Sequence, residues 1–217
     1  MTAYEKLDFW SLKAQKEGYP ARSVYKIREI DQKFAFFGNA GGRILDLGAA
    51  PGSWSLYVLR KFKPSGARGG PGGPESGGLL LAAADLLPLS RRFDGGLFDR
   101  EDFFFIQGDF TQDPLREALQ SRGPYTAVIS DAAPATTGNR TVDTLRSLAL
   151  AEDALAYAER CLAPGGNLVL KVFQGGDTAA LLKKLREDFG SARSFKPAVC
   201  RPGSFETYYI GLGKKTS

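Results

Sequence analysis

The chain has 217 residues, a formal charge of +5 from 29 Lys and Arg against 24 Asp and Glu, and 43% hydrophobic residues. The length fits one large domain, and the hydrophobic content excludes an intrinsically disordered chain. The sequence contains no histidine, which excludes Ser-His-Asp and Cys-His nucleophiles, imidazole metal sites and a histidine base. Cys161 and Cys200 cannot form a zinc site unaided, so we expect reduced thiols and no metal.

Two helices are predicted at the start of the chain. Residues 4–16 and 22–35 have helical patterns, separated by the breakers Gly18 and Pro20. Charged residues in the first sixteen positions exclude the apolar stretch of an export signal. The longest apolar run, at residues 79–84, is too short to span a bilayer, so we expect a cytoplasmic protein without membrane contact.

From residue 41 onward, predicted strands and helices alternate. Strands are predicted at residues 43–47, 79–84, 103–107, 125–130 and 167–173, with an aromatic stretch at 205–212, and helices at 54–62, 114–121, 141–162 and 178–189. This alternation predicts an α/β fold in which helices cover both faces of a mostly parallel sheet and ligands bind at the carboxyl ends of the strands.

We therefore predict a basic helical segment at residues 1–40 and a single domain at residues 41–217. Two inserts interrupt that domain. Residues 64–78 are rich in Gly and Pro, and residues 88–102 are charged and contain a turn signal, so both are predicted to be surface loops.

Basic residues gather toward both ends of the sequence. Residues 13–33, 60–68 and 183–217 carry an excess of Lys and Arg, whereas residues 84–159 carry an excess of acids. This distribution suggests a face that binds a polyanion such as RNA or DNA. Ordinary solvated helix faces would give the same pattern, so charge alone leaves both interpretations open.

Residues 46–54 (DLGAAPGSW) follow a predicted strand and open a helix, the position at which such folds bind nucleotide-like cofactors. Gly48 permits a tight turn, and Gly52 lets the chain approach a ligand. Ala50 stands where a dinucleotide-binding motif needs its second glycine, and no phosphate-loop motif occurs. Asp46, just before the turn, suits a cationic ligand, and S-adenosylmethionine carries sulfonium and ammonium groups.

Two more acids follow the next predicted strands. Asp85 can accept hydrogen bonds from ribose hydroxyls, and Asp109 can accept one from an adenine amino group. An acid in this position is often only a turn former or a helix cap. Three acids in register after successive strands favour a shared cofactor.

Six motifs occur in order: residues 46–54, DLLP at 85–88, QGDF at 107–110, SDAAP at 130–134, LAPGG at 162–166 and KVFQG at 171–175. Together they resemble the FtsJ/RlmE family of RNA ribose 2′-O-methyltransferases. The resemblance implies a Rossmann-like, S-adenosylmethionine-dependent methyltransferase fold with a seven-stranded sheet whose last strand is antiparallel. It also implies a set of residues that bind the cofactor, namely Asp46, Gly48, Gly52, Trp54, Asp85, Asp109 and Asp131.

That family uses a Lys-Asp-Lys-Glu tetrad, which motif matching places at Lys26, Asp131, Lys171 and Glu206. By resemblance, Lys171 accepts the proton of the ribose 2′-hydroxyl, and Lys26 supplies a neighbouring positive charge. Asp131 is assigned to orientation and to the methyl donor, and Glu206 to positioning Lys26 or the ribose. The sequence itself singles out Lys171, because a lysine inside the apolar run 167–173 needs a partner or a function.

The resemblance implies methylation of a uridine ribose in 23S (large-subunit) ribosomal RNA by a monomer. The alternatives are ribose methylation of a tRNA anticodon loop, a non-catalytic RNA-binding ribosome-assembly factor, and a small-molecule methyltransferase, which the basic ends and the tetrad disfavour. One position departs from the family pattern. Ala135 follows Pro134 where the family often has Asn, and this removes a hydrogen bond to substrate that other members can make.

Overall fold

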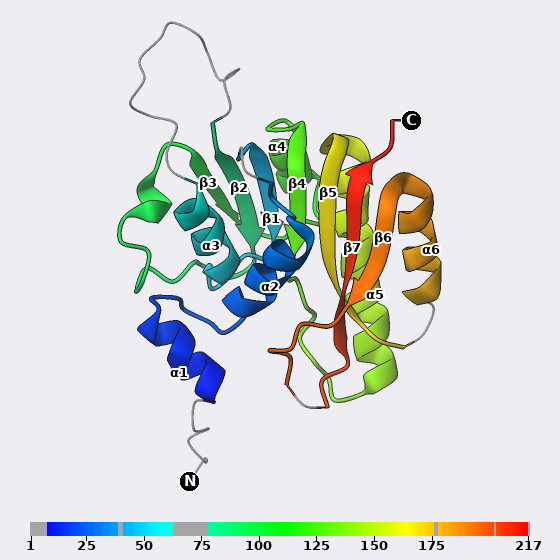
Figure 1. The fold of residues 1–217 in the computed structure, drawn as a ribbon, viewed down its shortest axis with the longest axis horizontal. Helices are drawn as coiled ribbons and strands as arrows, with labels where there is room; N and C mark the ends of the chain where they lie inside the picture. Colours follow the sequence, from blue (N-terminus) through cyan, green and yellow to red (C-terminus); the bar gives the residue numbers. More distant parts are fainter. Residues whose placement is uncertain (1–7, 39–40, 63–77, 176–177, 202, 217) are drawn as a thin grey trace, which may run out of the picture.

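The computed structural model describes residues 8–38, 41–62, 78–175, 178–201 and 203–216. A seven-stranded sheet in the order β3-β2-β1-β4-β5-β7-β6 forms its centre (Figure 1). The strands are β1 (Arg43–Leu47), β2 (Leu80–Asp85), β3 (Phe103–Gln107), β4 (Tyr125–Ser130), β5 (Leu162–Phe173), β6 (Phe189–Phe195) and β7 (Glu206–Lys214). Strand β7 pairs antiparallel with β5 and β6, and all other neighbouring pairs are parallel. The predicted mostly parallel sheet with an antiparallel last strand is confirmed.

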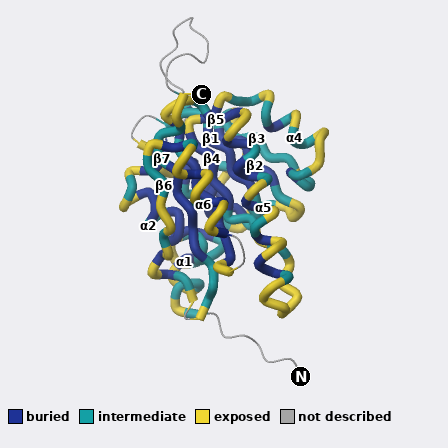
Figure 2. The backbone as a smooth tube through the Cα atoms, turned by 90° about the vertical axis from the view of Figure 1, so that its right-hand side faces the viewer, coloured by how far each residue is buried: buried dark blue, intermediate teal, exposed yellow. Residues whose placement is uncertain are grey.

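Helices cover both faces of the sheet, as predicted. Helices α2 (Val24–Phe34) and α3 (Ser53–Lys61) pack on one face, and α4 (Asp113–Gln120), α5 (Arg140–Cys161) and α6 (Thr178–Asp188) pack on the other. Helix α1 (Phe9–Lys16) lies near the carboxyl edge of the sheet, below α2 in Figure 1. Figure 2 shows the buried strands enclosed between these layers.

The strands are apolar on both sides because each face of the sheet carries its own core. In β1, Ile44 belongs to the hydrophobic cluster beneath α2 and α3, whereas Leu45 and Leu47 belong to the cluster beneath α5 and α6. Successive side chains of a strand point to opposite faces, so a parallel strand covered on both sides is a continuous apolar run.

The N-terminal helical segment and the second predicted insert both contribute to the core. Val24, Ile27 and Ile30 of α2 are buried in the same cluster as α3. Residues 88–102 are not only a surface loop: they include a 3₁₀ turn at Leu97–Asp99, and the buried Phe98 stacks on Phe103 with 5.0 Å between ring centroids. The first predicted insert, residues 64–78, lies outside the described residues except for residue 78.

The C-terminal strand also joins distant elements. It ends at Lys214, whose ammonium group donates hydrogen bonds to the main-chain carbonyls of Ala158, Glu159 and Leu162. These carbonyls lie at the end of α5, where a cation compensates unpaired acceptors and the helix dipole. Among the described residues, no helix has the length and apolar character that a membrane span requires.

Candidate active site

The four predicted tetrad residues meet at the carboxyl edge of the sheet. Lys26 comes from the first turn of α2, Asp131 directly follows β4, Lys171 lies on β5, and Glu206 begins β7. The antiparallel register of β5 and β7 pairs Phe173 with Glu206. The start of β7 therefore lies beside the end of β5, at the edge where the parallel strands also end.

Three lysine–carboxylate contacts join the tetrad, and two of them share Asp131. Lys171 Nζ lies 3.0 Å from Asp131 Oδ1 and also donates to the main-chain carbonyl of Asp131. Lys26 Nζ lies 2.9 Å from Glu206 Oε1 and 4.0 Å from Asp131 Oδ1. The two lysines are only 7% and 8% exposed, a burial that lysine tolerates only when its charge is paired.

Electrostatics keep the centre of this cluster ionised. Burial disfavours charge on Asp131, but Lys171, Lys26 and a hydrogen bond from Tyr208 outweigh it and hold the pKa of Asp131 below its ordinary value. Burial also disfavours charge on Lys26, but Asp131 and Glu206 outweigh it and raise the pKa of Lys26. At neutral pH, Asp131 is therefore a carboxylate and Lys26 an ammonium ion.

Tyr208 is a further member of the cluster, which the sequence analysis does not identify. It is fully buried opposite Lys171 on β7, and its hydroxyl donates to Asp131 Oδ1 at 2.6 Å. Burial raises the pKa of Tyr208 well above its ordinary value, so the phenol remains a neutral donor. Glu206 and Tyr208 are two residues apart on the last strand and so share one face, a signal available in the sequence.

A cavity of about 480 Å³ opens beside Asp131 and Lys171, a size typical of small-molecule sites. Three predicted cofactor acids, Asp85, Asp109 and Asp131, contribute to its wall. The remaining lining residues are mostly small or apolar: Ser23, Gly48, Ala50, Pro51, Leu86, Leu87, Pro88, Phe110, Ala132, Ala133, Leu150 and Lys171. The cavity is therefore apolar with an acidic rim, which suits a cationic ligand that has an apolar body.

Asp85 and Asp109 also organise the loops that carry them. Asp85 accepts the main-chain N–H groups of Ala50 at 2.9 Å and Leu87 at 2.8 Å, one on each carboxylate oxygen. Asp109 accepts the N–H and the hydroxyl of Thr111, and these bonds lower the pKa of Asp109. The turn-forming role and the cofactor role are compatible, because each carboxylate oxygen accepts more than one hydrogen bond.

Three predicted cofactor residues, Asp46, Gly52 and Trp54, lie outside the cavity lining. Gly52 has φ 106°, and a Cβ there would lie 2.7 Å from the ring of Phe98, so this glycine makes room for a side chain of the protein. Trp54 is buried, and its indole N–H donates to the carbonyl of Ser23 at 2.9 Å. Gly48 does line the cavity, and a Cβ there would lie 2.5 Å from Ala132 Cα, so it permits close approach of two loops.

Asp46 lies behind the cavity wall. Its Oδ2 accepts the hydroxyl of Ser55 at 2.6 Å, and its Oδ1 is buried without a hydrogen-bond partner among the described residues. Burial, supported by the nearby carboxylates Asp131 and Asp85 and opposed by the bond from Ser55, raises the pKa of Asp46 to about 7. Asp46 is thus poised to be neutral or charged near neutral pH.

This raised pKa predicts a pH-dependent stability that Asp46→Asn should remove. The folded state holds the Asp46 proton up to about pH 7, whereas the unfolded state releases it near 3.8, so the stabilisation is full below 3.8 and is lost as the pH rises through 7. Between pH 5 and pH 8, the free energy of unfolding of the native protein should fall by roughly 3 kcal/mol relative to the variant. Urea unfolding of both proteins at the two pH values measures this difference. If the free energies of unfolding of the two proteins differ by the same amount at both pH values, the pKa of Asp46 is not raised.

Comparisons with known proteins identify the family to which the chain belongs. The model for FtsJ-like methyltransferases matches residues 19–214. A Treponema denticola protein named ribosomal RNA large subunit methyltransferase E is 49% identical over 98% of this chain and 97% of its own length. Proteins of the same name from Oleidesulfovibrio alaskensis and Treponema pallidum are 44% and 40% identical, over 96% and 97% of this chain and 92% and 95% of theirs.

Among solved structures, a ribosomal RNA methyltransferase from Plasmodium falciparum superposes with a TM-score of 0.70. The superposition covers 92% of this chain and all of that one, and at 24% identity it speaks for the fold alone. This structure agrees with the present one in fold, and the family model matches nearly the full length of the chain. The chain belongs to the FtsJ-like methyltransferase family.

Proposed function

We propose that this protein methylates the 2′-hydroxyl of a uridine ribose in 23S (large-subunit) ribosomal RNA, with S-adenosylmethionine as methyl donor. The observation that carries the proposal is the buried cluster of Lys26, Asp131, Lys171 and Glu206 beside the acidic-rimmed cavity. Support for the RNA substrate comes from relatives at 40–49% identity whose name is ribosomal RNA large subunit methyltransferase E.

The cavity residues fit S-adenosylmethionine. We assign three acids of the cavity lining to it: Asp85 to the ribose hydroxyls, Asp109 to the adenine amino group and Asp131 to the positively charged reacting end. When bound, this cofactor supplies an electrophilic methyl group on a sulfonium. The apolar residues Leu86, Leu87 and Leu150 offer contact area for the adenosine and exclude water.

Lys171 is assigned the proton transfer. A ribose hydroxyl is a weak acid, so its proton must leave as the oxygen reacts, and the Lys171 amine at the cavity wall takes it. Asp131 orients Lys171 through two contacts, and Glu206 holds Lys26 in place.

All four residues come from a single chain, which supports a monomer as the active form. Action on ribosomal RNA would place the enzyme in the cytoplasm with ribosomes. The non-catalytic alternative is disfavoured because the cluster is complete, and tRNA is retained as an outcome of the test below.

Transfer of a labelled methyl group tests the proposal directly. Wild-type protein is incubated with labelled S-adenosylmethionine and with ribosomes, isolated large subunits, naked ribosomal RNA or tRNA, all from cells that lack it. Label recovered as a 2′-O-methyluridine in large subunits or their RNA is the expected result. Label in tRNA alone would replace the substrate assignment, and no label in any RNA despite measurable cofactor binding would favour a non-catalytic factor.

Asp85→Ala should weaken S-adenosylmethionine binding about 10- to 100-fold. The variant loses a charged acceptor for ribose hydroxyls, worth about 1.5–3 kcal/mol, and releases the main-chain N–H groups of Ala50 and Leu87. Calorimetric titration with S-adenosylmethionine measures the change. Asp99→Ala, at an exposed acid outside the cavity lining, is the matched control, and an unchanged affinity in Asp85→Ala would remove Asp85 from the site.

A further inference from the structure

Helix α1 presents a mixed aromatic and basic stripe to the solvent. Phe9, Leu12, Lys13 and Lys16 stand at positions i, i+3, i+4 and i+7 and thus on one side of the helix. All four are exposed, and Phe9 is 70% exposed. Large apolar side chains on an outward helix face, next to cations, are unusual for a surface that contacts only water.

The opposite side of α1 makes the contacts that hold this helix against the rest of the protein. The stripe is therefore not the core-facing side of the helix. Ala14 is completely buried, and Trp10 packs on Tyr25 with 5.2 Å between ring centroids. The side chain of Asp8 caps the helix by accepting the N–H of Ser11 at 2.8 Å. The orientation of α1 is therefore set, and the stripe faces outward because of it.

The same anchors hold α1 close to the tetrad. Arg22 pairs with Asp8 and donates to the main-chain carbonyl of Val199 at 2.7 Å, so it joins α1 to the segment that leads into β7. Arg22 lies in the turn just before α2, and Lys26 lies in the first turn of that helix. The stripe therefore lies at the same edge of the molecule as the active site.

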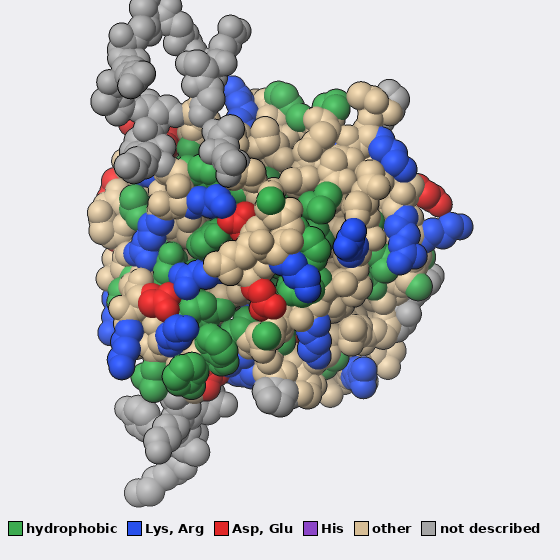
Figure 3. Space-filling model, in the orientation of Figure 1, with side chains coloured by type: hydrophobic (Ala, Val, Ile, Leu, Met, Phe, Trp, Pro, Cys, Tyr) green, Lys and Arg blue, Asp and Glu red, His purple; other side chains and the backbone are tan. Residues whose placement is uncertain are grey.

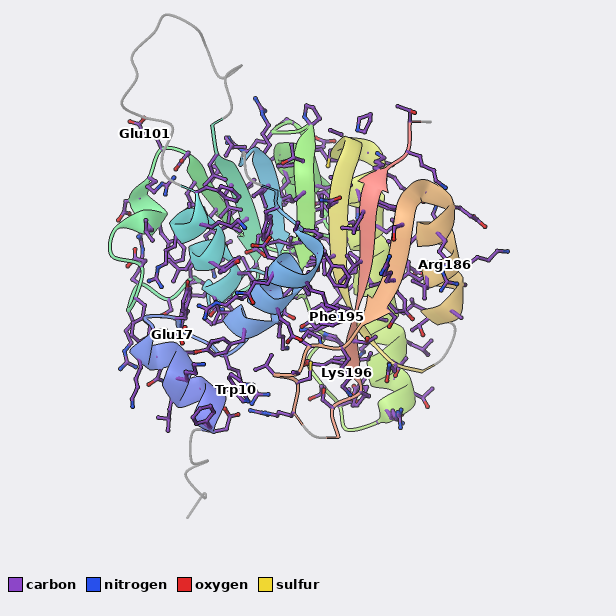
Figure 4. All side chains as sticks on the ribbon, viewed as in Figure 1. Trp10, Glu17, Glu101, Arg186, Phe195 and Lys196 are labelled. Atoms are coloured by element: carbon purple, nitrogen blue, oxygen red, sulfur yellow. The ribbon has the colours of Figure 1, made fainter. Side chains whose placement is uncertain are left out.

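Further cations flank the stripe. Arg201, with a side chain 71% exposed, places its Nε 3.8 Å from Asp8. Figure 3 shows the apolar patch over α1 with Lys and Arg side chains around it, and Figure 4 shows Trp10 of α1 and Lys196 of the β6–β7 connection along one edge. Lys16 makes no ion pair or side-chain hydrogen bond with any other described residue, so its charge is available to a ligand.

We propose that this α1 stripe binds single-stranded RNA flanking the target nucleotide, with a base stacked on Phe9 and phosphates held by Lys13, Lys16 and Arg201. The inference rests on the proposed function and adds the surface that holds its substrate. An exposed ring beside cations is the combination that single-stranded RNA recognises, since bases stack on the ring and phosphates pair with the charges. A protein partner would need a larger apolar surface than one Phe and one Leu.

Substitutions at Phe9 test the stacking. With naked large-subunit ribosomal RNA as substrate, Phe9→Ala and Phe9→Leu should raise KM about 5- to 100-fold with kcat unchanged, because each stacked base contributes substantially to affinity. Phe9→Trp should stay within about twofold of wild type, since it keeps an aromatic face. An unchanged melting temperature shows that the fold is intact, as expected for an exposed side chain.

Paired lysine variants test the charges. Binding of a fluorescein-labelled decauridylate is measured from 50 to 200 mM salt for the wild type, K13A/K16A and the control K184A/R186A. The control removes the same charge from α6, which packs on the opposite face of the sheet from α2 and carries the labelled Arg186 (Figure 4). The slope of log Kd against log salt should fall by about 1.4 in K13A/K16A, or about 0.7 per lost phosphate contact, and should not change in the control.

The outcomes separate this inference from the proposed function. Wild type that methylates none of the RNAs would overturn the proposed function. If the wild type is active and Phe9→Ala is equally active, only the proposed RNA binding by the α1 stripe is overturned. Two further results would show an apolar contact with protein and would also overturn RNA binding by the stripe. One is a raised KM of Phe9→Ala on large subunits but not on naked RNA. The other is a wild-type KM in Phe9→Leu.

Discussion

Lys171→Ala should lower the rate of methyl transfer by at least 100-fold and leave S-adenosylmethionine affinity within a few fold of wild type. Proton transfer by a positioned group contributes ~10²–10⁴-fold, and Lys171 is the assigned acceptor at the cavity wall. The rim acids that suit the cofactor, Asp85 and Asp109, remain in place. Single-turnover transfer of labelled methyl, with calorimetry on the same samples, separates the two effects.

Lys184→Ala is the matched control, because it removes an exposed lysine from α6 that touches neither the cavity nor the tetrad. Its rate should equal that of the wild type. A Lys171→Ala rate close to that of the control would show that the proton leaves by another route. A rate loss accompanied by an equal loss of cofactor affinity would make Lys171 a binding residue instead.

Asp131→Asn should abolish methyl transfer and lower the free energy of unfolding by about 3 kcal/mol at pH 7. The substitution removes the carboxylate that faces Lys171 at 3.0 Å and Lys26 at 4.0 Å, and so takes a charged partner from two buried lysine side chains. Urea unfolding and the methyl-transfer assay measure the two effects. Asp99→Asn, at an acid whose side chain is 65% exposed, should change stability by less than about 0.5 kcal/mol.

The stability deficit of Asp131→Asn should also depend on pH in a defined direction. The pKa of Asp131 is lowered from 3.8, so its stabilisation is present above 3.8 and is lost as the pH falls through the lower value in the folded protein. The deficit should therefore be full at pH 7 and should shrink by pH 3. An equal deficit at both pH values would mean that Asp131 acts through shape rather than charge.

The sequence predicted the central part of the sheet well because its strands are buried on both faces. Strand β4, for example, is buried at every position except Thr126. Strand β6 was not predicted, because it lies at the sheet edge, and of its seven residues only Phe189 is buried. Strand β5 begins five residues before its predicted start, since Pro164 and two glycines give a turn-like pattern within its first half.

The sequence motifs select the residues of the candidate site but do not predict the contacts between them. Motif order identified Lys26 and Glu206, yet only the register of β5 and β7 brings Glu206 to the edge beside Lys26. Gly52 and Trp54 were predicted to bind the cofactor, but their neighbours in the fold are Phe98 and Ser23. No local pattern reveals which of several motif residues face a cavity, because that depends on loops distant in sequence.

The position of β7 between β5 and β6 has a consequence for the completion of the active site. This strand is the last element that the structure describes, yet it lies inside the sheet and carries Glu206 and Tyr208. Strand β6 pairs only with β7 among the described strands, so it has no sheet partner until β7 is in place. Without β7, Lys26 lacks its closest carboxylate and Asp131 lacks the hydrogen bond from Tyr208.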